Sequence, residues 1–315
     1  MNELLRLNES VVEESEIDSL GHMNVRFYLS RVAAANIELM KRVGVEPAPD
    51  QFLRRVDTYS RFRNEQFAGA TLHTCGGVIQ HEPQDGQKGV RAYFEIRNPE
   101  TAEIAASFHI TSSLVDTVGQ VAVGIPNFQA RIADYVVTVP DHGMPRSLSL
   151  APPSVVEFAV LENAVGDEPT PGMMSGRKEN VIYEEDCDAA GRLREDIELM
   201  FAVHRSPPGH EGPNFGPEAM QDKTGRRYGW AMMETRNVTW NRPMAGDQIV
   251  SLGADIAFTE KSRQSRRWMF VKESGQPLGV SDTLGICINL DERRAMTIPD
   301  EIRGEIEANY LPQFA

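Results

Sequence analysis

The chain has 315 residues, a formal net charge of -14 and a hydrophobic fraction of 41%. This length and apolar content exclude a single small module and suffice for two domains with cores of their own. The acidic balance argues against a nucleic acid or an anionic membrane surface as a partner, because the average field of the protein would repel phosphate groups.

Cysteine usage and the N-terminal residues indicate a reducing compartment. Cys75, Cys187 and Cys287 are far apart and include no CxxC pair, so we expect free thiols, no disulfide framework and no metal site. The N-terminal residues include the early acid Glu3 and no long apolar run, which argues against a signal peptide, and no stretch is apolar enough to span a bilayer. These features favour a cytoplasmic protein.

The first informative segment is Asp18-Ser19-Leu20-Gly21-His22-Met23-Asn24, which precedes a predicted helix. Apolar residues recur at helical spacing from Val25 to Val43, and Gly44 is a typical C-terminal stop. A helix N-terminus presents unpaired N–H groups and the positive end of the helix dipole, so it favours an oxyanion developing on an attacked carbonyl group. A carboxylate, a glycine and an imidazole at such a place can hydrolyse a thioester.

Runs rich in β-branched and aromatic residues predict strands after this helix, at residues 71–81, 90–97 and 103–115. One long helix against several antiparallel strands is an α+β unit. Turn-forming residues without a clear period follow, from Val139 to Pro153, and indicate a linker.

The second half of the chain repeats the first. Residues 181–191 echo residues 11–21, with Asp188 and Gly191 each 170 positions after Asp18 and Gly21. The spacing rises to 177 between Gly69 and Gly246, which implies an insertion that we place at 206–213. Strands are predicted again, at residues 231–240, 248–259, 267–272 and 278–288. We therefore expect a duplicated domain, with boundaries at 1–140 and 176–315 and a linker at 141–175.

Three features resemble the hotdog-fold acyl-CoA thioesterases of the 4-hydroxybenzoyl-CoA thioesterase type, in a tandem form. They are the Asp18-x-x-Gly21-His22-Met23-Asn24 segment before a long helix, the turn at 242–247 between two strands, and the ending at 289–303. The resemblance implies two tandem hotdog domains, each an antiparallel sheet wrapped around one long helix, paired as a pseudo-dimer with active sites between the halves. It also implies an acyl-CoA substrate, no cofactor beyond the coenzyme A of that substrate, and room for assembly into a homo-oligomer.

The predicted chemistry centres on Asp18, which would activate water or attack the thioester carbonyl directly. Backbone N–H groups just after Gly21 would hold the oxyanion, His22 would polarise the carbonyl group or orient Asp18, and Asn24 would orient water or cap the helix. Simpler alternatives stay open. Asp18 can merely stabilise a turn, Asn24 fits an N-cap better than a catalyst, and Tyr28 fits core or acyl-pocket wall better than an acid.

The second copy keeps Asp188 and Gly191 but has Arg192 and Arg194 in place of His22 and Asn24. Asp188 is therefore either a second catalytic carboxylate or a vestigial one paired with an arginine. Glu65, in a turn between strands, is expected to be a solvated surface acid, with a second carboxylate in the site as the alternative.

Basic residues at 261–267 offer a contact for the phosphates of coenzyme A, and we single out Lys261, Ser262 and Arg263 as substrate-binding candidates. Arg54 and Arg55 belong to a second basic group; a solvated strand face is the alternative for both groups. The sequence thus predicts hydrolysis of an acyl-CoA thioester. The rivals are a hotdog hydratase or dehydratase, an acyl-ACP thioesterase, and a non-catalytic acyl-CoA binding protein.

Overall fold

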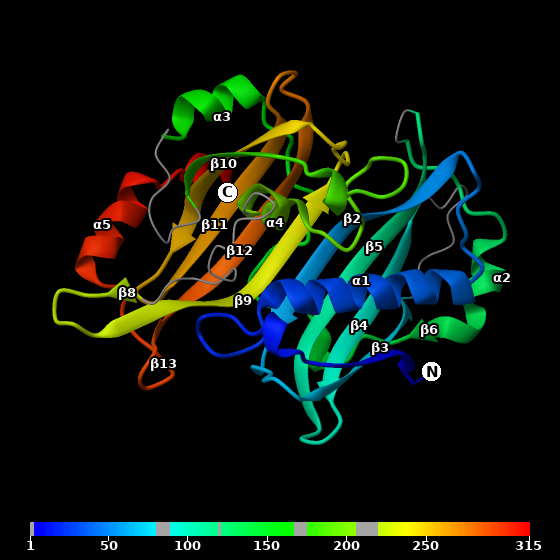
Figure 1. The fold of residues 1–315 in the computed structure, drawn as a ribbon, viewed down its shortest axis with the longest axis horizontal. Helices are drawn as coiled ribbons and strands as arrows, with labels where there is room; N and C mark the ends of the chain where they lie inside the picture. Colours follow the sequence, from blue (N-terminus) through cyan, green and yellow to red (C-terminus); the bar gives the residue numbers. More distant parts are fainter. Residues whose placement is uncertain (1–2, 80–88, 119–120, 167–174, 206–219) are drawn as a thin grey trace.

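One continuous antiparallel sheet forms the body of the protein (Figure 1). The structure is a computed structural model and describes residues 3–79, 89–118, 121–166, 175–205 and 220–315. The strand order along the sheet is β1-β3-β4-β5-β2-β9-β12-β11-β10-β7. The first half of the chain therefore supplies the strands at one end of this order, and the second half supplies the strands at the other end. They join where β2 pairs with β9, with Tyr59 opposite Arg236.

The first half wraps its strands around the 18-residue helix α1 (Val25–Arg42). Its strands are β1 (Leu5–Val11), β2 (Gln51–Phe62), β3 (Thr71–Ile79), β4 (Val90–Asn98) and β5 (Glu103–Asp116). Leu29, Val32 and Leu39 on one stripe of α1 are buried with Phe94 and Phe108 of the sheet in a single apolar cluster. The helix forms because this apolar stripe recurs at helical spacing, and it ends before Gly44, whose φ of 68° is in the left-handed region.

The second half repeats this strand arrangement with β7 (Gly176–Val181), β9 (Arg227–Thr239), β10 (Gln248–Phe258), β11 (Ser262–Val271) and β12 (Pro277–Asn289). Its helix α4 (Leu199–His204) packs on the same side of the sheet as α1, because Phe201 of α4 contacts both the first-half cluster and the cluster beneath α4. The predicted pair of tandem α+β units is confirmed. The described part of the second helix has six residues, and the predicted insertion at 206–213 lies outside the described residues.

The opposite face of the second half is covered by α3 (Phe158–Ala164), whose Leu161 is buried with Leu252, Trp268 and Phe270. The helix α5 (Asp300–Ala308) packs through Ile302 and Ile306 on a further small cluster. The remaining α-helix and strands are short, namely α2 (Phe128–Ile132), β6 (Val136–Val137), β8 (Met220–Gln221) and β13 (Arg294–Ala295).

Part of the segment predicted as a linker crosses the junction between β2 and β9. The Ser147 and Leu148 N–H groups each donate to Glu234 Oε2 at 3.0 Å, and Arg236 Nη1 donates to the carbonyl oxygens of Ser149 and Ala151. These contacts fasten the segment to β9 of the second half. In the described parts of the chain, no helix combines the length and the apolarity needed to cross a membrane.

Candidate active site

The segment from Asp18 to Asn24 forms a tight loop directly before α1. The Asp18 N–H donates to the His22 carbonyl oxygen at 2.9 Å, and the Gly21 N–H donates to the Asp18 carbonyl oxygen at 3.0 Å. Gly21 has a φ of 84°, which disfavours any residue with a side chain. The glycine therefore allows the loop to turn back on itself and bring Asp18 and His22 together.

The Asp18 carboxylate is held in place by the loop and by the helix cap. Its side chain is 3% exposed, Oδ1 accepts the Leu20 N–H at 2.9 Å, and Oδ2 accepts Asn24 Nδ2 at 3.3 Å. Asn24 Oδ1 in turn accepts the Arg26 N–H at 3.1 Å, which confirms the predicted N-cap. Asn24 thus links the helix start to the carboxylate.

The His22 imidazole lies between two carboxylates. Its Nδ1 is 3.8 Å from Asp18 Oδ2, and its Nε2 is 3.4 Å from Glu65 Oε1. Glu65 was expected at the surface, and its side chain is indeed 42% exposed, but it reaches the predicted site. The alternative of a second carboxylate near His22 is the one that the geometry favours.

The backbone N–H groups of the loop are mostly occupied. Gly21, Met23 and Asn24 donate to the carbonyl oxygens of Asp18, Gln66 and Glu16. The His22 and Val25 N–H groups make no hydrogen bond with any described residue. The predicted oxyanion donors therefore narrow to these two N–H groups, at the positive end of the α1 dipole.

The second half contributes Arg293 to this loop. From the hairpin between β12 and β13, Arg293 Nη1 donates to Glu65 Oε1 and Nη2 donates to the Leu20 carbonyl oxygen, both at 3.1 Å. Nothing in the sequence singles out Arg293, because an exposed hairpin carries no local pattern that signals a contact 273 residues away. Its φ of 53° is the one local sign that its position is special.

Tyr28 is part of the core. It is 4% exposed and packs edge-on against the Phe62 ring at 5.7 Å between centroids. Its hydroxyl donates a long hydrogen bond to the Asn64 carbonyl oxygen at 3.4 Å, and burial raises its pKa far above the usual range. These features favour the core alternative over an acid.

The second copy of the loop has the same backbone but different side-chain pairing. The Asp188 N–H donates to the Arg192 carbonyl oxygen at 2.7 Å, and Gly191 has a φ of 78°. Here, however, Asp188 Oδ1 accepts the Arg192 N–H at 3.0 Å, and Oδ2 lies 3.4 Å from the Arg192 guanidinium. The N–H equivalent to that of His22 is therefore occupied, and the Asp188 side chain is 39% exposed.

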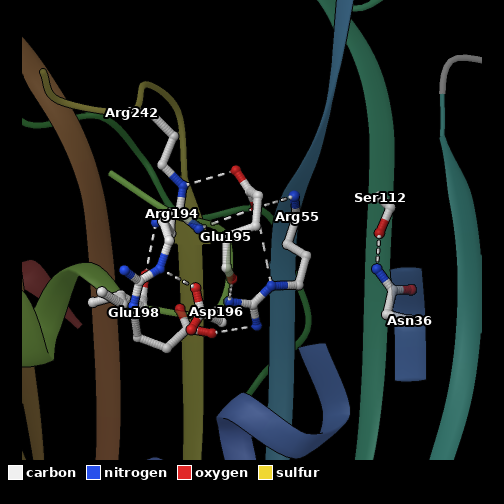
Figure 2. A network of polar contacts seen from close by, with 9 residues as sticks. Asn36, Arg55, Ser112, Arg194, Glu195, Asp196, Glu198 and Arg242 are labelled. Atoms are coloured by element: carbon white, nitrogen blue, oxygen red, sulfur yellow. Dashed lines mark hydrogen bonds and ion pairs between the residues drawn. The ribbon is translucent and has the colours of Figure 1, made fainter. Parts of the chain in front are cut away.

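A network of arginines and carboxylates follows this second loop (Figure 2). Arg194 pairs with Asp196 at 3.0 Å, and Glu195 accepts hydrogen bonds from Arg242 Nε at 3.0 Å and from the Arg55 N–H at 2.9 Å. Arg55 also pairs with Glu198. The second copy is thus built as a junction between the halves, and Arg55 is a buried structural residue instead of a surface contact for phosphates.

The same junction borders a pocket of about 420 Å³ between α1, β2 and Glu195. Asn36 lines it and donates through Nδ2 to Ser112 Oγ at 2.8 Å (Figure 2). The remaining lining residues are mostly apolar, namely Ala33, Ile37, Met40, Lys41, Val45, Glu46, Pro47, Leu53 and Arg55. This pocket lies beside the second copy of the loop, at the boundary of the two halves.

Of the three predicted contacts for coenzyme A, Lys261 lies in the turn between β10 and β11, and Ser262 and Arg263 are the first two residues of β11. Lys261 is exposed, and Ser262 Oγ lies 2.8 Å from Thr259 Oγ1. Arg263 is 4% exposed, its Nε lies 3.3 Å from Asp255 Oδ1, and its guanidinium lies 5.1 Å from the centre of the Trp230 ring. A buried arginine does not meet a phosphate at the surface, so that part of the prediction is corrected; Lys261 and Ser262 stay predictions.

Solved structures match this architecture along most of the chain. A 12:0-ACP thioesterase from Umbellularia californica is 12% identical with a TM-score of 0.61, over 90% of this chain and 94% of that one. A putative oleoyl thioesterase from Lactobacillus plantarum is 10% identical with a TM-score of 0.59, over 90% and 96%. The fold is a tandem hotdog fold.

An acyl-ACP thioesterase from Bacteroides thetaiotaomicron has this fold as well, with 9% identity and a TM-score of 0.57 over 88% of this chain and 96% of that one. No protein-family model matches the sequence, and no curated protein matches it significantly. At such low identity the likeness establishes the architecture, and the chemistry has to be argued from the side chains.

Proposed function

We propose that the protein hydrolyses an acyl thioester at the Asp18 loop, with acyl-CoA as the substrate. The observation that supports this best is the combination at one helix N-terminus of a buried carboxylate, an imidazole and two N–H groups without partners among the described residues. Acyl transfer to water needs a base or nucleophile at the carbonyl carbon and donors at its oxygen. The Asp18 loop offers both.

In the proposed reaction the thioester carbonyl oxygen accepts hydrogen bonds from the His22 and Val25 N–H groups. Asp18 takes a proton from water as the water oxygen bonds to the carbonyl carbon. The tetrahedral intermediate then collapses, the carbon–sulfur bond breaks, and the leaving thiolate takes up the proton that Asp18 removed from water, directly or through His22. Direct attack by Asp18 through an anhydride gives the same products.

Glu65 and Arg293 act on His22 in this scheme. Glu65 Oε1 lies 3.4 Å from His22 Nε2 and is itself held by Arg293 at 3.1 Å. Two carboxylates that flank an imidazole restrict the orientation of the ring in the site. The second half would thereby complete a site whose main residues come from the first half.

Asp188 is assigned no catalytic role. Its carboxylate is engaged by Arg192, and the second copy lacks both the histidine and the free N–H group at the corresponding place. One functional site per chain follows, with the other copy serving the junction between the halves.

The test is thiol release from a panel of acyl-CoA thioesters. Asp18→Asn is expected to lower kcat at least about a hundredfold, since it removes the base while keeping the shape. Asp188→Asn is the matched control, in the same backbone loop, and is expected to retain activity within about twofold. Full activity of Asp18→Asn, or loss of activity in Asp188→Asn alone, would contradict the assignment.

The same assay distinguishes hydrolysis of acyl-CoA from the alternative functions. Two of the matching structures carry the name acyl-ACP thioesterase, so each acyl group is offered both on coenzyme A and on an acyl carrier protein. Faster release from the carrier protein would replace the acyl-CoA proposal. Water addition to an enoyl-CoA without thiol release would indicate a hydratase, and binding without turnover would indicate a binding protein.

A further inference from the structure

The pocket of about 420 Å³ lies beside the second copy of the loop, to which no reaction is assigned. It is bordered by the C-terminal part of α1, the segment after this helix, β2 and Glu195. Its buried lining residues are Ala33, Asn36, Met40, Val45 and Arg55. Its exposed lining residues are Ile37, Lys41, Glu46 and Pro47. The pocket therefore has a buried base and an opening to solvent.

Polar groups gather at one end of the pocket. Arg55 pairs with Ser112 in the sheet, and Asn36 Nδ2 donates to Ser112 Oγ at 2.8 Å, so α1 and β2 both present a polar residue here (Figure 2). Glu195 lies at the same end, because its carboxylate accepts the Arg55 N–H at 2.9 Å. This end therefore adjoins the second copy of the loop.

The other end of the pocket is apolar. One turn of α1 beyond Asn36, the lining residues are Met40, Val45 and Leu53. Met40 and Val45 belong to the apolar cluster of the first half, and Leu53 packs against it. From Ala33 to Met40 the pocket extends about 10 Å along the helix axis. An elongated ligand with a polar group at one end and an aliphatic chain at the other fits this arrangement.

Asn36 interrupts the apolar stripe of α1. It is 1% exposed, and Val32 and Leu39, its neighbours on the buried side of the helix, are fully buried. Its Oδ1 has no hydrogen-bond partner among the described residues. A buried polar atom without a partner is destabilising, so a hydrogen-bond donor from outside the chain is expected here. Arg55 and Glu195 already have protein partners, which leaves the Asn36 amide for the ligand.

The pocket lies where the acyl group of a thioester bound at the second loop would lie. The Arg192 guanidinium of this loop is 4.2 Å from the centre of the Phe52 ring, and Phe52 precedes Leu53 of the pocket. Glu195 occupies the place of Val25 in the repeat, and its N–H likewise makes no hydrogen bond with any described residue. One of the two oxyanion donors proposed for the first loop thus persists in the second copy, at the polar end of the pocket.

We propose that this pocket is a second ligand site, which binds a 3-hydroxyacyl chain of medium length and does not hydrolyse it. The ligand's carbonyl oxygen accepts the Glu195 N–H, its hydroxyl group donates to Asn36 Oδ1, and its alkyl chain fills the apolar end. Because Asp188 is engaged by Arg192, no base acts on the bound thioester, and the one hydrolytic site per chain is unaffected. The choice of an acyl ligand rests on the proposed function, whereas the pocket itself calls for an apolar chain with a hydrogen-bond donor near its polar end.

The test measures calorimetric binding of 3-hydroxyoctanoyl-CoA and octanoyl-CoA to Asp18→Asn, which should not turn over either thioester. We expect two binding events per chain for 3-hydroxyoctanoyl-CoA. At the second site octanoyl-CoA should bind at least about tenfold more weakly, because it lacks the hydroxyl group and leaves Asn36 Oδ1 unpaired. Coenzyme A alone is the control for binding that does not depend on the chain.

Three variants in the Asp18→Asn background locate the site. Ile37→Glu places a charge at the opening, on a side chain that is 39% exposed, and should abolish one binding event. Asn36→Leu replaces the acceptor by an apolar group of similar size, so it should weaken binding of 3-hydroxyoctanoyl-CoA at least about tenfold without weakening that of octanoyl-CoA. Ala34→Glu, exposed on the same helix and outside the pocket, is the matched control and should bind like Asp18→Asn.

The outcomes separate the two proposals. An unchanged number of binding events in Ile37→Glu would overturn the second site, and so would equally tight binding of coenzyme A alone. Equal affinities for the two thioesters at the site that Ile37→Glu removes, or an equal loss for both in Asn36→Leu, would overturn the choice of a 3-hydroxyacyl chain.

Thiol release completes the comparison. A hundredfold loss of kcat/KM in Ile37→Glu, made in the wild-type chain, would show that the pocket serves the hydrolytic site; it would overturn a separate second site while hydrolysis stands. Absence of thiol release by the wild type from every thioester, together with loss of one binding event in Ile37→Glu, would overturn hydrolysis and keep the second site. Absence of both would overturn both.

Discussion

Arg55 and Glu198 form a buried ion pair that joins the two halves of the chain. Arg55 Nη1 lies 2.5 Å from Glu198 Oε1, and each side chain is 3% exposed (Figure 2). Arg55 comes from β2 and Glu198 is the residue before α4. Removing the Glu198 charge leaves the buried Arg55 guanidinium with only the more distant Glu195 carboxylate, 4.0 Å from its Nε, and breaking a buried pair typically costs about 3–5 kcal/mol.

We therefore predict that Glu198→Gln lowers the free energy of unfolding by about 3 kcal/mol. The corresponding positions in the other copy of the repeat suggest a double variant as the control. Tyr28 and Met232 occupy the places that Glu198 and Arg55 occupy in the other copy, and both belong to one apolar cluster. Arg55→Met with Glu198→Tyr should recover most of the loss. Denaturant unfolding measures both; a double variant no more stable than the single one would contradict the account.

Arg293 is predicted to support activity with little effect on stability. Arg293→Asn removes the bonds to Glu65 and to the Leu20 carbonyl oxygen, and asparagine tolerates the left-handed φ of 53°. Because the side chain is 44% exposed, the free energy of unfolding should change by less than about 1 kcal/mol. We expect kcat/KM to fall about tenfold, because His22 loses the support of a fixed Glu65.

The split of the loss between kcat and KM distinguishes positioning from a general structural role. Arg293→Asn should lower kcat more than it changes KM, since Glu65 and the Leu20 carbonyl oxygen lose the contact that holds them beside His22. Arg294→Asn, at the next residue, is the control and should behave like the wild type. Unchanged kcat and KM in Arg293→Asn would show that the second half does not act on this loop.

Tyr28→Phe is predicted to keep kcat within about twofold. The hydroxyl makes one long hydrogen bond, to the Asn64 carbonyl oxygen, and burial raises its pKa, so it is a poor proton donor or acceptor for catalysis. The free energy of unfolding should fall by at most about 1 kcal/mol. Steady-state kinetics of Tyr28→Phe, measured in parallel with Asp18→Asn, check this. A hundredfold loss of kcat in Tyr28→Phe would show that the Tyr28 hydroxyl takes part in catalysis.

The fold was predictable because the duplicated pattern is local. Gly21 and Gly191 share a left-handed φ, as do Gly69 and Gly246, so the repeated glycines mark repeated turns. The Asn24 cap and the helix after it were likewise readable from residue types at fixed spacing. Such features depend on a few neighbouring residues and little else.

Contacts between the halves were not predictable in this way. Arg293 and Leu20 meet only because β9 pairs with β2, a register that no single strand reveals. Arg263 lies in a basic run of the sequence and is nevertheless buried, because alternate residues of β11 face opposite sides of the sheet. The polar character of the side of β11 that carries Arg263 becomes visible only when the two halves of the chain are compared strand by strand.

His204 is predicted to make the protein less stable in acid. Burial, with help from Arg267 and Lys178, lowers its pKa to about 2, against 6.5 for an unperturbed histidine. Between these values the unfolded chain binds a proton that the folded protein does not, so stability is fully present above pH 6.5 and is lost as the pH falls. Allowing for partial exposure, we expect about 1 kcal/mol of the free energy of unfolding to be lost over the first pH unit below 6.5.

Unfolding of His204→Gln between pH 8 and 5 should lack this component, because glutamine does not titrate and can still accept the Lys178 hydrogen bond. Parallel stability curves for the wild type and His204→Gln would show that His204 takes up its proton in the folded protein as it does in the unfolded chain.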